Sequence, residues 1–465
     1  MPACHCNDFS RAAFLRAGAA QAGKGLRAIE AGMPTPAGTG LNRRSFLART
    51  GGLALAVYGG KAMSPAIWED GIASAAAAGT KPPVIVSIFM SGGADSLSML
   101  APLGDAKYAT LRPTLKLADS GNPLDVFTED SRLRWHPDLA PIRDLHRAGK
   151  VSVIPAVGYD DPNQSHFTSR HYWEVGELNP LGRIGWMGRF LDRHGSADNP
   201  LQGLSLDSSL APALAAGSVP VAAVASPESY SLWTRDVWDN TLDTKLNQRF
   251  GLLGGLPTAD TALAGARVAA KQTVALQDEL APLSNRSPAW QPPASYPDSY
   301  FARRLAVLAE MLGMGLPLQC VALDANGGYD THEGQSGTLH DELAELAASI
   351  AAFQADIESR MEGTAPLADR VLIQVWSEFG RRPRENGSGT DHGAGGMSML
   401  IGTKAKGTMV GEFPGLGTLD DDGNLLHTVD FRHVYKHVVS DWLQVDPTGI
   451  VPDAAKFTSS LALVK

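Results

Sequence analysis

Several short apolar runs without polar alternation constrain the fold of this chain more than any other sequence feature. They cover residues 84–90, 151–157, 219–224, 318–323 and 371–376, with a shorter run at 398–401. A strand without alternation is buried on both faces, which is typical of a sheet covered by helices. Amphipathic stretches lie between these runs, at residues 138–147, 165–174, 301–312, 339–360 and 431–443. This succession predicts an α/β fold with a doubly wound, mostly parallel sheet.

Composition and charge exclude several classes of protein. Of the 465 residues, 44% are hydrophobic and 19% are charged, which is ample for a buried core and excludes wholesale disorder. The net charge of −9 argues against a nucleic-acid partner. The chain contains no apolar run long enough to span a bilayer, so we expect no stable membrane anchor.

The first 75 residues differ from the rest in charge, with eight basic and four acidic residues. Arg43 and Arg44 precede a Gly-rich apolar stretch at residues 51–60, and a small-residue Ala-Ser-Ala site ends at Ala75. This arrangement resembles a twin-arginine export signal; the alternative is a basic, Ala-rich tail. The resemblance implies the twin-arginine translocase as a partner during export. We therefore expect an extracellular, periplasmic or cell-wall-associated protein.

The rest of the chain divides by pattern. Residues 82–445 carry the strands and helices of the predicted α/β domain, and residues 446–465 form a C-terminal tail. Residues 226–300 interrupt the strand–helix succession with an Ala-rich helical stretch and a Pro/Ser-rich loop. We interpret them as a helical insertion.

Polar groups follow the predicted strands, at the edge where α/β sheets bind their ligands. Asp95 follows the first run and is a candidate metal ligand or general base, the alternative being a helix cap. Ser165 begins the helix after the second run, where backbone N–H groups favour an anion. It is a candidate nucleophile toward a phosphate or sulfate ester, and the alternative is an N-cap. His166 beside it is a candidate base or ligand.

The later strand ends carry acid and imidazole pairs. Asp330 and His332 lie two residues apart in a Gly-rich loop, a spacing that lets both side chains reach one ion. After the fifth run come a carboxylate that is a candidate metal ligand, an arginine suited to an oxyanion, and an adjacent acid–imidazole pair; these are Glu378, Arg381, Asp391 and His392. We expect these groups to meet at one site, although a solvated Gly-rich loop is the alternative for the last pair.

The sequence blocks SGGADSLSM, NQSHFTSRHYWE, GGYDTHEGQ, SEFGRRPRENGSGTDHG and VDFRHVY resemble, in this order, the domain-of-unknown-function 1501 family. That family is similar to the alkaline-phosphatase superfamily, which includes sulfatases. The resemblance implies an alkaline-phosphatase-like fold and a two-metal ester hydrolase, with metal ligands Asp95, Asp330, His332, Asp391 and His392 and the nucleophile Ser165. In Asp330 and His332 the superfamily's Asp-x-x-x-His spacing is shortened to Asp-x-His.

These observations predict an exported, metal-dependent hydrolase of phosphate or sulfate esters. Its substrate is a small-molecule or polymer-attached ester, and its cofactor is one or two divalent ions among Zn, Mn, Ca and Mg. The alternative is a non-catalytic envelope or carbohydrate-binding protein on a degenerate hydrolase fold. An isomerase or transferase that passes a phosphoryl group through the same serine is a third hypothesis.

Overall fold

The computed structural model describes residues 33–38, 55–56 and 81–465. Arg43, Arg44 and the predicted cleavage site lie outside these residues. The chain divides into two compact units, of which the second contains residues 85–178, 293–309 and 324–465. The first contains residues 179–292, 310–323 and the described residues up to Val84. Among the described residues, no helix is both long enough and apolar enough to cross a membrane.

The second unit contains five strands of the main sheet. They are β2 (Val84–Phe89), β5 (Val151–Gly158), β11 (Val371–Trp376), β14 (Gly396–Ile401) and β15 (Val429–Asp430), in the order β2-β11-β14-β5-β15. Every residue of β2, β5, β11 and β14 is buried, as the absence of polar alternation predicts. The α/β class is confirmed, and the sheet is mixed because β14 runs antiparallel to both β11 and β5.

Strand β5 accommodates Pro155, a residue that cannot donate to a sheet ladder. The pairing between β5 and β14 shifts register at this point, since Gly396 pairs with Val157 while Ser398 pairs with Ile154. A register shift removes the need for a backbone donor there, so a proline is tolerated inside a central strand.

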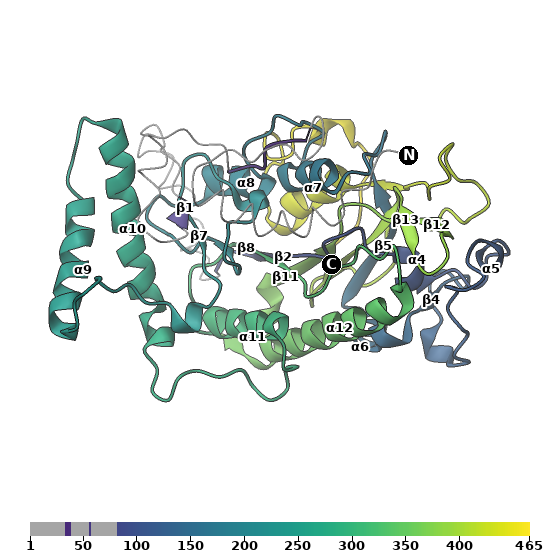
Figure 1. Cartoon of the computed structure of the whole chain (residues 1–465), viewed down its shortest axis with the longest axis horizontal. Coiled ribbons are helices and arrows are strands. Elements are labelled where there is room, and N and C mark those ends of the chain that lie inside the picture. Colours follow the sequence, from purple (N-terminus) through teal and green to yellow (C-terminus); the bar gives the residue numbers. More distant parts are fainter. Residues whose placement is uncertain (1–32, 39–54, 57–80) are drawn as a thin grey trace. The chain divides into compact units, whose positions relative to one another are not determined.

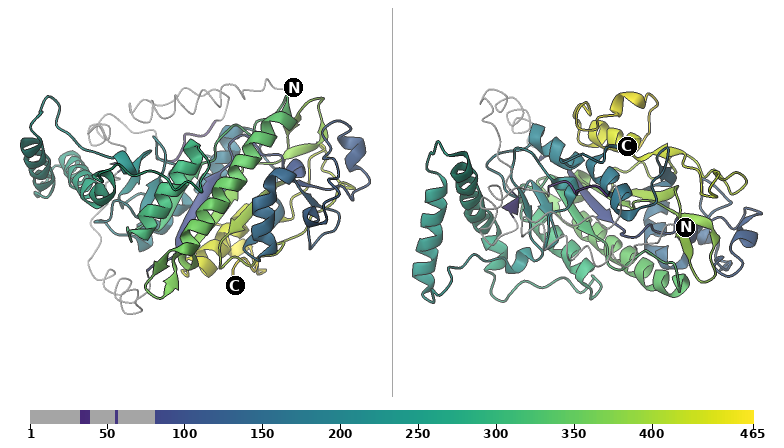
Figure 2. Two further views of the ribbon diagram at one scale, coloured as in Figure 1. Left: turned by 90° about the horizontal axis from the view of Figure 1, so that it is seen from below. Right: turned by 45° about the horizontal axis from the view of Figure 1, so that its top comes forward.

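Helices lie on both faces of this unit's strands. Figure 1 shows α7 (His166–Val175) on one face, and α12 (Gln335–Ser359) with α6 (Ala140–Arg147) on the other. Trp173 of α7 stacks on Trp376 of β11 and on Phe431 of α13 (Phe431–His437), with ring centroids 5.2 and 4.6 Å apart. The long helix α12 lies beside α6, as Figure 1 and the left view of Figure 2 show.

The second unit also contains short helices and two-stranded pairs outside the main sheet. The helices are α4 (Ser96–Met99) and α5 (Tyr108–Leu111), and the strand pairs are β3 (Leu100–Ala101) with β4 (Arg134–Trp135) and β12 (Arg381–Glu385) with β13 (Thr390–His392). A further pair joins β9 (Met361–Glu362) to β10 (Ala365–Pro366) after α12.

The first unit has its own strands in the order β1-β7-β6-β8: β1 (Leu55–Ala56), β7 (Val221–Ala223), β6 (Gly203–Ser205) and β8 (Cys320–Asp324). It also contains α8 (Trp186–His194) and the helical pair α9 (Asn240–Gly254) and α10 (Thr261–Ser284), which lie side by side in Figure 1. This pair occupies the region predicted as a helical insertion. Helix α11 (Tyr300–Gly313) follows it in the chain.

Candidate functional site

The candidate site is built from four segments of the second unit: the loop after β2, the start of α7, the loop before α12, and the ribbon of β12 and β13. Gly92, in the loop after β2, has a φ of +120°. A Cβ atom at this position would lie 2.3 Å from the backbone nitrogen of Asp330. Only glycine therefore allows the loop after β2 to lie against the Asp330 loop.

Three side chains converge at the centre of this arrangement. His166, Asp330 and His392 each offer one ligand atom, and these atoms all lie within 4.8 Å of one another. Asp330 Oδ2 lies 3.5 Å from His166 Nε2, and Asp330 Oδ1 lies 3.3 Å from His392 Nε2. His332 is next to them, with its Nε2 atom 3.0 Å from His392 Nε2 and 3.1 Å from Asp330 Oδ1.

In two of these imidazoles, the Nδ1 atom is hydrogen-bonded to an acceptor outside the cluster. His166 Nδ1 lies 2.8 Å from Glu378 Oε1, and His392 Nδ1 lies 2.8 Å from the carbonyl oxygen of Gln164. Both partners are acceptors, so each Nδ1 carries a hydrogen and each Nε2 is directed into the cluster. This arrangement, in which an outer acceptor fixes the tautomer and the ring direction, is the usual one for metal-binding histidines.

The charges of the cluster are strongly coupled. Burial opposes the charged form of His166, but hydrogen bonds to Asp330 and Glu378 outweigh it and raise the pKa of His166 to about 9. Burial also opposes the charge of Asp330, yet three imidazoles and Arg381 hold the pKa of Asp330 far below its ordinary value. The pKa of His392 is lowered, first by burial and then by the positive charges of His166 and Arg381.

Arg381 is buried in the site, and its Nε, Nη1 and Nη2 atoms all donate to acceptors of the protein. Its Nε atom donates to the carbonyl of Gly93 at 2.8 Å, and its Nη1 atom donates to the carbonyl of Thr390 at 2.8 Å. Its Nη2 atom forms an ion pair with Asp330 and also donates to the carbonyl of Gly92. Arg381 thus joins the loop after β2 to the Asp330 loop, instead of presenting its guanidinium for an oxyanion as its sequence position suggests.

Asp95, a predicted metal ligand, lies outside the cluster. Its carboxylate forms a fully buried pair with Arg112, and it also accepts hydrogen bonds from Ser98 and Gln335. Burial would raise its pKa, but Arg112 outweighs burial and lowers the pKa of Asp95 below its ordinary value. Asp95 is therefore an anchor for neighbouring polar groups.

Glu378 and Asp391, also predicted as ligands, take other places. Glu378 is fully buried and accepts hydrogen bonds from the backbone N–H groups of Gly92 and Gly93 as well as facing His166. Asp391 follows Thr390 in β13 and is 46% exposed, with its Oδ1 atom 3.7 Å from His332 Nδ1. Successive residues of a strand point to opposite faces, so Asp391 and His392 cannot both turn into the cluster.

Ser165, the predicted nucleophile, is the N-cap of α7. Its Oγ atom accepts a hydrogen bond from the backbone nitrogen of Thr168 at 3.4 Å. Its own backbone nitrogen donates to Asn163 Oδ1 at 2.9 Å. The cap fixes the start of the helix and so places His166, the first helical residue, beside Asp330.

Some site residues could not be identified from the sequence. Phe379 packs against the rings of His166 and His392, with centroids 5.0 and 4.8 Å away. Gln164 contributes only its backbone carbonyl, a group that every residue carries. The position of Phe379, directly after Glu378, is the one signal that could have indicated its role.

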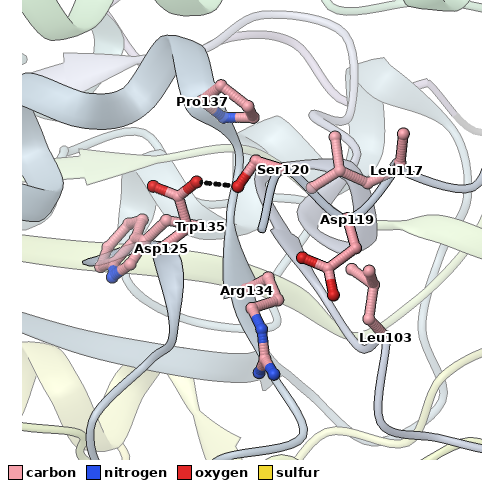
Figure 3. Close-up of a pocket in the computed structure, with 9 residues that line it drawn as sticks. Leu103, Leu117, Asp119, Ser120, Asp125, Arg134, Trp135 and Pro137 are labelled. Carbon is pink, nitrogen blue, oxygen red and sulfur yellow. Dashed lines mark hydrogen bonds between the residues drawn. The ribbon is translucent and has the colours of Figure 1, made fainter. Parts of the chain in front are cut away.

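A separate pocket lies elsewhere in the second unit. Residues between Leu103 and Pro137 line it, and Figure 3 shows Ser120 donating to Asp125 at 2.6 Å on its wall. None of the predicted site residues contributes to this pocket. This pocket is therefore separate from the His166–Asp330–His392 cluster.

Comparison with known families finds a match over part of this chain. Residues 214–439 match the DUF1501 family, described as a protein of unknown function. This match supports the family that the sequence motifs predict. The DUF1501 region contains Asp330, His332, Glu378 and His392, whereas His166 precedes it. No curated protein matches the chain.

Proposed function

We propose that this protein is an exported, metal-dependent hydrolase of phosphate or sulfate esters, with one ion held by His166, Asp330 and His392. The observation that carries the proposal is the convergence of two imidazole Nε2 atoms and one carboxylate, while each Nδ1 is hydrogen-bonded to an outer acceptor. Three protein ligands are typical of catalytic zinc sites, which keep a further position open.

The chemistry of the donors narrows the choice of metal. Imidazole nitrogen suits Zn and neighbouring transition metals, whereas Ca and Mg prefer sites made only of oxygen ligands. A divalent ion at this position would supply Lewis-acid polarisation of an ester oxygen. The residues support a mononuclear site, because Asp95 and Glu378, which the sequence suggested as further ligands, are bound to other partners.

The residues around the cluster suit an anionic ester. His332 is 29% exposed at the edge of the cluster, so it is placed to donate or accept a proton at its imidazole. Helix α7 begins at His166, and the positive end of its dipole favours an anion there. Phe379 packs against the rings of His166 and His392 and gives the cluster an apolar neighbour.

The export part of the proposal rests on the sequence. Arg43 and Arg44, the Gly-rich apolar stretch and the Ala-Ser-Ala site follow the order of a twin-arginine signal. This pathway carries folded proteins. It would therefore deliver the protein with its metal already bound, to an extracellular, periplasmic or cell-wall location.

Metal analysis tests the proposal directly. The purified full chain is expected to contain about one transition-metal ion, and His392→Ala is expected to lose it while retaining the fold. His340→Ala is the matched control, because His340 is an exposed histidine of α12 that bonds to Asp138 outside the cluster. A protein that binds no Zn or Mn, or a His392→Ala variant with unchanged metal content, would contradict the proposed site.

Activity distinguishes the hydrolase from the second candidate function. That candidate is a non-catalytic envelope or carbohydrate-binding protein, and the observation favouring it is the commitment of Arg381 to backbone carbonyls and Asp330. Hydrolysis of p-nitrophenyl phosphate or p-nitrophenyl sulfate that disappears in His392→Ala supports the hydrolase. A metal-loaded protein that hydrolyses neither ester supports the non-catalytic function.

A further inference from the structure

A buried polar network is centred on Gln335, the first residue of α12. It contacts the loops that carry the candidate ligands. The Gln335 side chain is 1% exposed. Its Oε1 atom accepts hydrogen bonds from Thr331 Oγ1 at 3.1 Å and Thr390 Oγ1 at 2.7 Å. Its Nε2 atom donates to Asp95 Oδ2 at 2.5 Å and to Ser98 Oγ at 3.3 Å.

The direction of the Gln335 amide is fixed by the charge of its partner. Asp95 is fully buried, and Arg112 binds both of its carboxylate oxygens, so it is held as an acceptor. Only the nitrogen of an amide can face such an acceptor, so the Gln335 oxygen must face the other way. The two threonine hydroxyls lie on that side and donate to it.

These hydroxyls belong to the two loops that bring ligands to the cluster. Thr331 lies between Asp330 and His332, and Thr390 lies two residues before His392. The loops also meet directly, since the backbone nitrogen of Thr390 donates to the carbonyl of Thr331 at 3.1 Å. One amide oxygen therefore joins the Asp330 loop to the His392 strand.

We propose that Gln335 is a positioning residue that clamps the two ligand-bearing segments together and thereby sets the metal affinity of the site. The metal part rests on the proposed function, whereas the clamp itself is a property of the metal-free chain. A residue beneath the ligands acts through their orientation, and loss of such outer partners typically weakens metal binding by about 10–100-fold. This role also explains the burial of Asp95, which aligns the amide.

The test compares Gln335→Met with Gln354→Met in the purified full chain. Both glutamines lie in α12 and are 1% exposed, and methionine has a similar length without hydrogen-bonding groups. Gln354 donates to Glu358, not to a ligand loop. Zn²⁺ affinity is measured by competition with a chelator, and backbone hydrogen exchange is measured in the metal-free protein over residues 327–332 and 388–393.

Gln335→Met is expected to weaken Zn²⁺ binding by about 10–100-fold and to accelerate exchange in both segments by about tenfold or more. Gln354→Met is expected to change neither quantity. Unchanged affinity and exchange in Gln335→Met, or equal changes in both variants, would overturn the clamp. If wild type binds no Zn²⁺ while exchange still accelerates in Gln335→Met alone, the clamp stands and the proposed function fails.

Single-hydroxyl variants keep the test decisive if Gln335→Met does not fold. Thr331→Val removes one donor and is expected to accelerate exchange chiefly in residues 327–332. Thr390→Val is expected to act chiefly on residues 388–393. Each is expected to weaken Zn²⁺ binding less than Gln335→Met, because the other hydroxyl remains bonded. Normal exchange and affinity in both variants would overturn the proposal.

Discussion

Replacing Glu378 with glutamine tests whether one buried carboxylate holds the candidate site together. Its two oxygens receive hydrogen bonds from Gly92 N at 3.0 Å, Gly93 N at 3.1 Å and Ser377 Oγ at 2.9 Å, and face His166 Nδ1 at 2.8 Å. Glutamine has a similar shape but only one accepting oxygen. Its NH₂ group would point at donors that already carry hydrogens, so at least one buried donor loses its acceptor.

The size of the effect follows from burial and charge. A hydrogen bond to a charged group contributes about 1.5–3 kcal/mol, and breaking a buried ion pair costs about 3–5 kcal/mol. Glu378 is fully buried, so water cannot replace the lost acceptor. We therefore expect Glu378→Gln to lower the free energy of unfolding by about 3–5 kcal/mol, measured by urea unfolding of the metal-free protein at pH 7.

Glu385→Gln is the matched control for this experiment. Glu385 also accepts hydrogen bonds from two backbone nitrogens and a hydroxyl, in Thr114 and Leu115, but these bonds are near the surface. Water can replace them, so the expected loss is about 1 kcal/mol or less. A Glu378→Gln variant that loses no more stability than this control would refute the reasoning.

Three further predictions concern other parts of the chain. Ser165→Ala should lower the free energy of unfolding by about 1 kcal/mol because it removes the α7 cap, whereas Ser165→Asn should keep the cap and the stability. If both variants lose ester hydrolysis, the Ser165 hydroxyl is the nucleophile. If Ser165→Asn retains activity, the hydroxyl is not the nucleophile. Burial raises the pKa of Glu342 to about 7, so its contribution to stability is complete below an unfolded-state pKa near 4.5 and is lost as the pH rises through 7. The stability of Glu342→Gln relative to wild type, measured by urea unfolding, should therefore be about 1 kcal/mol higher at pH 8 than at pH 4.5. An equal difference between variant and wild type at both pH values would contradict this. Arg43→Lys with Arg44→Lys should leave uncleaved protein in the cytoplasm, as fractionation and immunoblotting would show, and normal export would contradict the twin-arginine signal.

The strands could be predicted because each buried run is a local property of the sequence. The runs at 84–90 and 371–376 became β2 and β11 almost residue for residue. Strand β6, with only the residues Gly203–Ser205, carries no apolar pattern and was not predicted. The antiparallel direction of β14 depends on which distant strands it joins, and no local pattern contains that information.

The candidate site was predictable as a gathering of strand-end groups, but the roles within it were not. Asp330, His332 and His392 do meet, as the rule for α/β sheets suggests. Asp95 has the same sequence signature as Asp330, a carboxylate in a glycine-rich turn. Both carboxylates pair with a buried arginine, but Asp330 also faces the imidazoles of His166 and His392, which the fold brings to it from other segments.

The register between β12 and β13 decides which side chain of β13 lies beside Asp330. Arg381 and His392 are directly opposite across this ribbon, and the residues between β12 and β13 form its turn. If β13 shifted by one residue against β12, Asp391 instead of His392 would lie opposite Arg381. His392 and Asp391 would then exchange environments, so that a carboxylate replaced an imidazole beside Asp330. Such a shift would give a ligand set richer in oxygen, and oxygen-rich sets prefer other metals than nitrogen-rich sets do.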